Sequence, residues 1–238
     1  MSVWSDLELD PRIHRLISLV GGGGKTTLMY ALAREATAQG LRVIVTTTTH
    51  IRPHPTLPTT DCPELDRLRQ LLTRPGVLLV GRPTQGGKLA GAGDAASFLS
   101  AADVVLVEAD GSKGLPLKAP AGHEPVIPPR SDAVIAVVGA DCVGRPIEQV
   151  CHRPERVCAL LESPPQHLVQ PKDIVRIVTS PLGGRKSVAP GMAFRCAVNK
   201  SDRNPRAASE LRFRLQALGV PTAVTSFTEQ ERDGKCLF

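Results

Sequence analysis

Aromatic side chains are scarce in this chain: phenylalanine, tryptophan and tyrosine together make up 3% of its 238 residues. Proteins that bind single-stranded nucleic acid usually offer aromatic stacking platforms, and many DNA-binding proteins carry a dense basic helix. Here the basic residues are spread along the sequence, although the formal net charge is +6. We therefore expect no nucleic-acid partner and interpret the excess charge as solvated surface plus a few side chains that face an anion.

Long apolar runs and paired cysteines are also missing. No run approaches the roughly 20 apolar residues that span a bilayer, and residues 1–11 carry acids and Trp4 where a secretory signal would be basic and then apolar. The cysteines, which include Cys236, are scattered without a Cys-x-x-Cys pair, and this favours free thiols over disulfides or a zinc site. These absences predict a cytoplasmic protein that does not enter a membrane.

Apolar segments alternate with helical patterns along most of the chain. Buried strands are predicted at residues 16–20, 41–45, 77–80, 103–107, 133–138, 193–198 and 221–226. Helices are predicted at residues 27–39, 64–72, 155–161, 172–178 and 205–218. Alternating strands and helices indicate an α/β fold with a mainly parallel sheet, right-handed crossovers and helices on both faces.

Proline and glycine interrupt this pattern near residues 53–63, 82–94 and 111–130. The first stretch is too rich in proline to form regular structure, the second is typical of a glycine-rich loop or hairpin, and the third is a long proline-rich segment. We expect a single domain over residues 1–238, with these stretches as insertions.

The first predicted strand runs directly into a phosphate-binding sequence, which consists of Gly21, Gly22, Gly23, Gly24, Lys25, Thr26 and Thr27. Glycines adopt the positive-φ turns that direct backbone N–H groups at an anion, and we expect Gly22, Gly23 and Gly24 to form this cradle. The helix that follows points its positive dipole end at the same place. In such a P-loop, Lys25 bridges the β- and γ-phosphates and the Thr26 hydroxyl binds Mg²⁺. The full pattern has glycine where this chain has Leu19, which predicts a shorter or differently turned entry.

Two carboxylates follow the strand predicted at residues 103–107. Side chains alternate along an extended segment, so Glu108 and Asp110 point the same way. A P-loop protein needs a carboxylate at the end of a neighbouring strand to hold magnesium directly or through water. We therefore predict that Glu108 and Asp110 bind the metal with Thr26 and take part in catalysis with Lys25. An ordinary acidic turn is the alternative.

A second nucleotide-binding sequence follows the strand predicted at residues 193–198. Asn199, Lys200 and Asp202 match the Asn-Lys-x-Asp pattern with which GTPases bind guanine. In that interpretation Asp202 accepts both guanine N–H donors, and adenine is rejected because the buried acceptor would lose its donors. The alternative is a polar helix cap formed by Asp202 or Asn204.

Further polar residues cluster where the second substrate of an α/β protein would bind. Lys113, Lys118, His123 and Glu124 lie in the proline-rich segment after the carboxylates, and His50 follows a run of threonines. This segment is expected at the carboxyl edge of the sheet, where α/β proteins bind ligands. For each of these residues, a surface-loop role stays open.

These blocks, together with Thr-Thr-Thr-Thr-His at residues 46–50 and Cys-His-Arg-Pro-Glu at residues 151–155, resemble the YqeC family in order from about residue 17 to residue 202. The resemblance implies a bacterial, cytoplasmic accessory protein of selenium-dependent molybdenum hydroxylases, linked to selenium cofactor biosynthesis. The implied partner is a molybdenum hydroxylase or a cofactor-maturation protein. More distantly, the loop and Asn-Lys-x-Asp resemble the P-loop GTPases that include signal-recognition-particle GTPases and metallochaperones, although Val20 stands where some dimeric members carry a second lysine.

The residues and the resemblance together predict a P-loop NTPase three-layer fold and a Mg²⁺-dependent nucleoside triphosphatase that binds GTP or ATP, with GTP preferred. One alternative is a slow nucleotide switch that binds a partner protein, with residues 46–63 and 111–128 ordered by the γ-phosphate. Another is a small-molecule kinase in which Lys113, Lys118 and His123 line an acceptor pocket.

Overall fold

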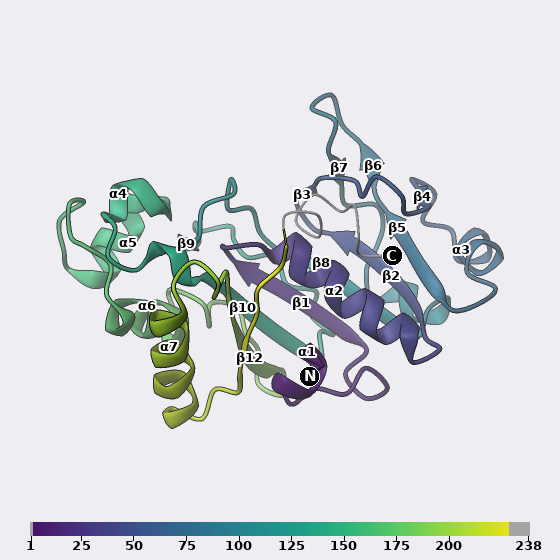
Figure 1. Ribbon diagram of the computed structural model, residues 1–238. Coiled ribbons are helices and arrows are strands. Elements are labelled where there is room, and N and C mark those ends of the chain that lie inside the picture. Colours follow the sequence, from purple (N-terminus) through teal and green to yellow (C-terminus); the bar gives the residue numbers. More distant parts are fainter. Residues whose placement is uncertain (1, 229–238) are drawn as a thin grey trace.

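A sheet of parallel strands forms the centre of the molecule, for which the computed structural model describes residues 2–228 (Figure 1). The sheet has 8 strands in the order β13-β12-β10-β1-β8-β2-β5-β4, and every neighbouring pair is parallel. Their bounds are Leu16–Gly21 (β1), Arg42–Thr47 (β2), Thr59–Thr60 (β4), Gly76–Val80 (β5), Val104–Glu108 (β8), Ala133–Gly139 (β10), Ala193–Asn199 (β12) and Thr222–Val224 (β13). The predicted α/β class is confirmed.

Helices cover both faces of this sheet and complete three layers (Figure 1). One face carries α1 and α2, whereas the other carries α3 at one end and α4 to α7 at the other. The bounds are Val3–Asp6 (α1), Lys25–Ala38 (α2), Leu65–Leu71 (α3), Ile147–Val150 (α4), Pro154–Leu161 (α5), Pro171–Thr179 (α6) and Pro205–Ala217 (α7), with 3-10 turns at Ser97–Ser100 and Ala140–Cys142. Among residues 2–228, no helix has the length and apolar character needed to cross a membrane.

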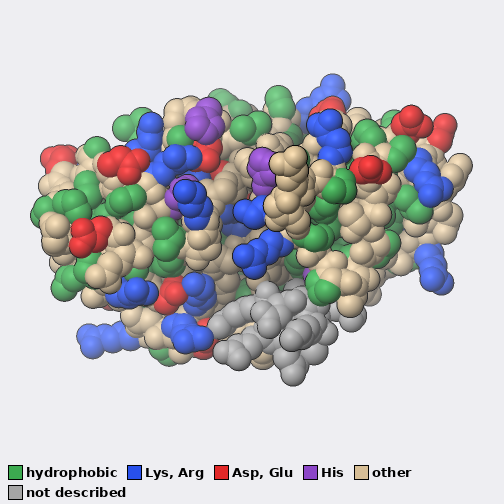
Figure 2. Space-filling view, turned by 90° about the horizontal axis from the view of Figure 1, so that it is seen from above, with side chains coloured by type: hydrophobic (Ala, Val, Ile, Leu, Met, Phe, Trp, Pro, Cys, Tyr) green, Lys and Arg blue, Asp and Glu red, His purple; other side chains and the backbone are tan. Residues whose placement is uncertain are grey.

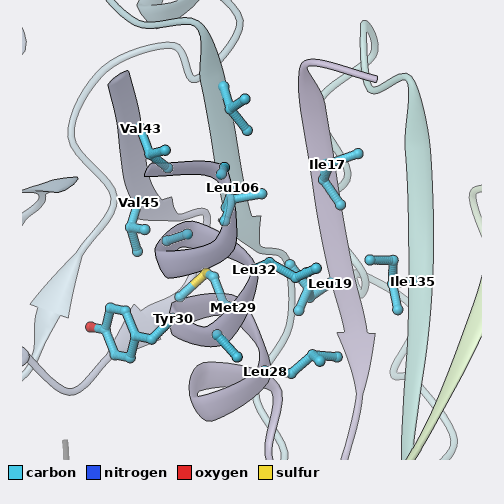
Figure 3. Packing of buried hydrophobic residues seen from close by; sticks show 14 of the residues in the cluster. Ile17, Leu19, Leu28, Met29, Tyr30, Leu32, Val43, Val45, Leu106 and Ile135 are labelled. Carbon is cyan, nitrogen blue, oxygen red and sulfur yellow. The ribbon is translucent and has the colours of Figure 1, made fainter. Parts of the chain in front are cut away.

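Alternation of side chains along the strands separates the two faces. Ile17 and Leu19 belong to the core cluster beneath α2, whereas Leu16 and Val20 belong to clusters on the opposite face. Figure 3 shows Leu32 of α2 lying against Leu19 of β1. All of these side chains are buried. The core therefore fixes the first turn of α2 directly above the end of β1.

Short strands lie beyond the carboxyl edge, the edge of the sheet at which its parallel strands end (Figure 1). A small antiparallel sheet has the order β3-β7-β6, and a separate parallel pair joins β9 to β11. Their bounds are His50–Ile51 (β3), Arg82–Pro83 (β6), Leu89–Ala90 (β7), Leu117–Lys118 (β9) and Cys151–His152 (β11). Of the loop or hairpin predicted near residues 82–94, the structure shows the hairpin, formed by β6 and β7. The assignment of the chain to one domain stays a prediction.

The expectation that residues 53–63 form no regular structure is wrong at β4. Thr59 and Thr60 pair in parallel with β5 at the edge of the main sheet. The carbonyl of Pro58 accepts a hydrogen bond from the Leu79 N–H at 2.9 Å. Proline lacks a donor but keeps its carbonyl acceptor, so it is compatible with an edge strand that pairs on one side only.

The cysteines of the described residues are free, as predicted; they are Cys62, Cys142, Cys151, Cys158 and Cys196. Burial raises the pKa of Cys151 and of Cys196 to about 12. A thiol with such a pKa stays protonated at neutral pH and is a poor nucleophile. Cys236 lies outside the described residues.

Candidate functional site

A cavity of about 1410 Å³ opens at the carboxyl edge. Parallel strands bring their last residues to one edge of a sheet, and this places the end of β8 and the start of α2 side by side. Gly24, Lys25, Thr26, Thr27 and Glu108 form one part of the cavity lining. Figure 2 looks onto this face and shows lysine, arginine and histidine side chains gathered near its centre.

Lys25 is buried at this part of the lining, with its side chain 2% exposed. Its Nζ lies 3.1 Å from Asp110 Oδ1 and 3.7 Å from Glu108 Oε1, and it donates a hydrogen bond to the carbonyl of Gly21 at 2.7 Å. Burial alone would lower the pKa of Lys25, but the two carboxylates outweigh burial and raise it. The side chain therefore stays a cation. Both carboxylates reach it, as the alternation along the strand predicts.

Glu108 connects β8 to the first turn of α2. The Thr26 hydroxyl donates a hydrogen bond of 2.6 Å to Glu108 Oε2. Burial raises the pKa of Glu108, and the neighbouring Lys25 and Thr26 offset only part of this effect. A hydroxyl and a carboxylate held together in this way form an oxygen donor pair of the kind that hard divalent cations prefer.

Asp110 lies beneath the loop and is absent from the cavity lining defined by the described residues. It accepts hydrogen bonds of 3.1 Å from the Gly21 N–H and contacts Lys25 Nζ at 3.1 Å. On its other side, Asp110 Oδ2 lies 3.1 Å from Lys118 Nζ. Asp110 thus joins two buried lysines to the backbone of the loop.

The glycine loop, residues 21–24, uses three of its N–H groups within the protein. Gly21 donates to Asp110, Gly22 donates to the carbonyl of Val137 at 2.9 Å, and Gly23 donates to the carbonyl of Leu115 at 3.0 Å. Of the predicted cradle, only Gly24 lines the cavity, together with residues 25–27 at the start of α2. The first N–H groups of a helix have no intrahelical acceptor, and no side chain of residues 2–228 caps α2. Leu19 remains in β1, so the turn begins at Gly21.

We expect Gly23→Ala to destabilise the protein more than Gly40→Ala. Both glycines have a φ of +82°, so an alanine is strained at either position. A Cβ at Gly23 would overlap the backbone of Gly139, whereas a Cβ at Gly40 would meet open space. Overpacking adds about 1–3 kcal/mol, or roughly 2–12 °C in a protein of this size. Thermal unfolding followed by circular dichroism measures the difference, and equal melting temperatures for the two variants would contradict the close packing of the loop.

Asn199 connects the end of β12 to the glycine loop. Its Nδ2 donates to the carbonyl of Gly23 at 2.9 Å, and its Oδ1 accepts hydrogen bonds from the Lys200 N–H and the Thr225 hydroxyl. The Asn204 side chain caps α7 by accepting from the Ala207 N–H. Asn204, one of the two residues that the alternative interpretation named as a helix cap, therefore caps α7. Asn199 has a different role, because its side chain binds the glycine loop.

The rest of the Asn-Lys-x-Asp sequence lies beside the loop and outside the cavity lining of the described residues. Lys200 Nζ forms an ion pair of 2.8 Å with Asp141 Oδ2, which follows β10. Asp202 Oδ1 accepts a hydrogen bond of 2.8 Å from the Ser226 hydroxyl. Asp202 keeps 39% of its side-chain surface exposed, so its carboxylate is accessible from solvent.

The proline-rich segment contributes a charged wall to the cavity. Buried Lys118 contacts Glu124 Oε2 at 3.0 Å, and Arg153 contacts Glu124 Oε1 at 3.1 Å. Burial alone would raise the pKa of Glu124, but hydrogen bonds from Arg153 and Lys118 lower it to about 2. Glu124 is therefore ionised at neutral pH and is held by two cations.

A family model described as "YqeC protein" matches residues 17–155, more than half of the chain. The chain belongs to the YqeC family. A relative from Escherichia coli (strain K12), described as "Uncharacterized protein YqeC", is 37% identical over 211 residues, which cover 84% of this chain and 82% of the relative. No solved structure matches the chain significantly. The region matched by the YqeC family model contains the glycine loop, both carboxylates and the charged wall.

The structure gathers some, but not all, of the predicted site residues around the cavity. Those that line it are Gly24, Lys25, Thr26, Thr27, Glu108, His50, Lys113, His123 and Glu124. Those that lie beneath or beside it are Gly21, Gly22, Gly23, Asp110, Lys118, Asn199, Lys200 and Asp202. Cavity residues that were not named as site residues include Tyr30, Arg52, His54, Lys88, His152 and Arg153. The block Cys-His-Arg-Pro-Glu, shared with the YqeC family, was the available signal for His152 and Arg153.

Proposed function

We propose that this protein is a Mg²⁺-dependent nucleoside triphosphatase with a preference for GTP. The observation that supports this most directly is the 2.6 Å contact between the Thr26 hydroxyl and Glu108 beside buried Lys25. In P-loop enzymes a hydroxyl and a strand-end carboxylate hold the metal, while the lysine stabilises charge on the transferred phosphoryl group. A loop hydroxyl, a strand-end carboxylate and a buried ammonium group are thus adjacent here.

The residues present fit a magnesium site that is completed by a nucleotide. Among residues 2–228 no group of three or more His, Cys, Asp or Glu side chains is placed to hold a metal. Mg²⁺ typically takes one or two protein oxygens and completes its shell with phosphate and water. Thr26 and Glu108 would supply these oxygens, and the ion would neutralise phosphate charge. Glu108 lines the cavity and Asp110 does not, which favours Glu108 as the metal carboxylate.

The biological role that we propose is support of cofactor maturation for a selenium-dependent molybdenum hydroxylase. This part of the proposal depends on membership of the YqeC family and on the role that the sequence resemblance implies. A small-molecule kinase is a second candidate, because the cavity extends from the first turn of α2 to Lys113 and His123. An acceptor bound there would accelerate consumption of triphosphate.

Calorimetric titration with GTP and ATP, with and without Mg²⁺, tests the proposed function. We expect GTP to bind more tightly than ATP, and magnesium to strengthen both. Asp202→Ala should reduce the preference for GTP by about 10- to 100-fold, because a charge-assisted hydrogen bond is lost. Glu210→Ala, which removes an exposed carboxylate on α7, is the matched control. Failure of both nucleotides to bind would refute the proposal, and equal affinity would refute the guanine preference.

A further inference from the structure

The cavity is larger than a single small ligand requires. Its volume of about 1410 Å³ exceeds the roughly 300–1,000 Å³ that is usual for a small-molecule site. Only residues 24–27 and Glu108 belong to the part assigned above to phosphate and magnesium. The remaining lining comes from segments after β2, after β8 and around β11.

A nucleotide in the proposed orientation would leave this remaining part open. With its phosphates at the first turn of α2 and its base at Asp202, it would extend from β1 over β10 towards β12. The lining that follows β8 and β2 lies on the other side of β1, whereas the lining around β11 is joined through β9 to the end of β10, where the Gly139 N–H donates to the carbonyl of Pro116. This step rests on the proposed function. It places the lining that follows β8, which includes Lys113, at the γ-phosphate end of the nucleotide.

Positive charge is concentrated in that open part. Lys113, His152 and Arg153 line it, and Lys118 lies beneath them. Burial lowers the pKa of His152, and the nearby cations Lys118 and Arg153 lower it further, with a smaller effect from Lys113. The carboxylate of Glu124 acts on the same imidazole in the opposite direction. His152 is therefore surrounded mainly by positive charge.

The excess positive charge of the cavity does not come from its paired cations. The carboxylates Glu108, Asp110 and Glu124 balance the cations Lys25, Lys118 and Arg153. The ammonium group of Lys113 makes no ion pair or hydrogen bond with any residue between 2 and 228. Arg52 and Lys88 also line the cavity, and their charged groups likewise have no such partner within the described residues. Lys113, Arg52 and Lys88 are exposed, so the cavity offers an excess of accessible positive charge, which attracts a ligand of the opposite charge.

The backbone supports the same interpretation. Arg153 has a φ of 62° and Lys113 a φ of 51°, both in the left-handed region that residues other than glycine rarely adopt. Such conformations cost free energy and are concentrated at ligand sites and active sites. Both basic side chains are thus presented to the cavity from strained positions.

We propose that the part of the cavity formed by Lys113, His152 and Arg153 binds a second small molecule that carries a phosphate or carboxylate group, next to the γ-phosphate of the nucleotide. Arg153 binds Glu124 through Nε and Nη2, and its remaining N–H donors suit either anion, while Lys113 adds a mobile point charge. His152 accepts or donates a hydrogen bond according to its protonation state. The ligand is an anionic acceptor or effector.

Calorimetric titration with citrate and with inorganic phosphate tests this site. The protein is first saturated with Mg-GDP, so that the first turn of α2 is occupied. We expect at least one probe to bind, and Lys113→Ala and Arg153→Gln each to weaken it by about tenfold because one charged hydrogen-bond donor is lost. Lys172→Ala removes an exposed lysine on α6 and should leave the affinity within about twofold, as expected for a solvated surface charge. Binding of citrate alone would identify a carboxylate ligand, and binding of phosphate alone a phosphate ligand.

The same titrations separate failure of this inference from failure of the proposed function. If GDP does not bind, the probes are titrated into free wild-type protein and into Lys25→Ala. Probe binding that survives Lys25→Ala and is lost in Lys113→Ala supports the second site, although the nucleotide proposal has failed. Probe binding that depends on Lys25 and not on Lys113 overturns the inference. It is also overturned if neither probe binds the wild-type protein.

Discussion

Lys25→Ala is expected to weaken triphosphate binding and turnover by roughly 100- to 1,000-fold. This is the usual loss when one preorganised donor to a developing negative charge is removed. Lys25 is buried at the start of α2, and its cationic form is favoured by Asp110 and Glu108. Steady-state release of phosphate and calorimetric affinity for GTP, both at saturating Mg²⁺, measure the effect.

The control for Lys25→Ala is Lys172→Ala, which removes an exposed lysine. It should leave the rate of phosphate release and the affinity for GTP unchanged. Because Lys25→Ala also removes a buried cation, circular dichroism must show that the variant is folded.

Thr26→Val is an independent test, since it keeps the shape of the side chain and removes the hydroxyl that contacts Glu108. We expect it to abolish the magnesium dependence of binding. Turnover by Lys25→Ala at the wild-type rate would show that the loop is not a phosphate site.

Asp110→Ala is expected to lower stability by about 3–5 kcal/mol, the range found when one partner of a buried ion pair is removed. For a chain of this length, the melting temperature would fall by about 6–20 °C. The reason is that Asp110, which is 1% exposed, is held between Lys25 and Lys118 and accepts hydrogen bonds from the Gly21 N–H. Without the carboxylate, two buried ammonium groups lose a common counter-ion.

Asp66→Ala is the matched control for Asp110→Ala. Asp66 forms an ion pair of 2.9 Å with Arg69 on α3, but its side chain is 89% exposed. Exposed pairs of this kind contribute about 0.3–0.5 kcal/mol, so the melting temperature should change by no more than about 2 °C. Scanning calorimetry compares the two variants. If Asp110→Ala had the same melting temperature as Asp66→Ala, the contacts around Asp110 would have no net effect on stability.

The sequence was most informative where the structure depends on local patterns. The strands β1, β8 and β10 consist of apolar runs, and α2 follows its glycine loop with helical spacing, so all of these were predicted nearly to the residue. Elements that depend on distant partners were missed. The two residues of β3 form a strand only because β7 pairs with them.

In the functional site too, features that depend on neighbouring residues were predicted, and features that depend on distant residues were missed. Alternation along β8 predicted that Glu108 and Asp110 share a side, and both do contact Lys25. Alternation does not say how deep each side chain lies, and only packing places Glu108 at the cavity and Asp110 beneath the loop. His152 and Arg153 enter the site through the pairing of β9 with β11. No local pattern encodes that pairing.

The helix that begins at Lys25 carries one natural optical reporter and contacts another on α1. The only tryptophan of the chain, Trp4, is 1% exposed and donates its indole N–H to the carbonyl of Leu32 on α2 at 3.0 Å. The only tyrosine, Tyr30, lies on the same helix and lines the cavity. Intrinsic fluorescence of the unlabelled protein therefore follows both the packing of α2 against α1 and events inside the cavity, and the tryptophan can be excited without the tyrosine.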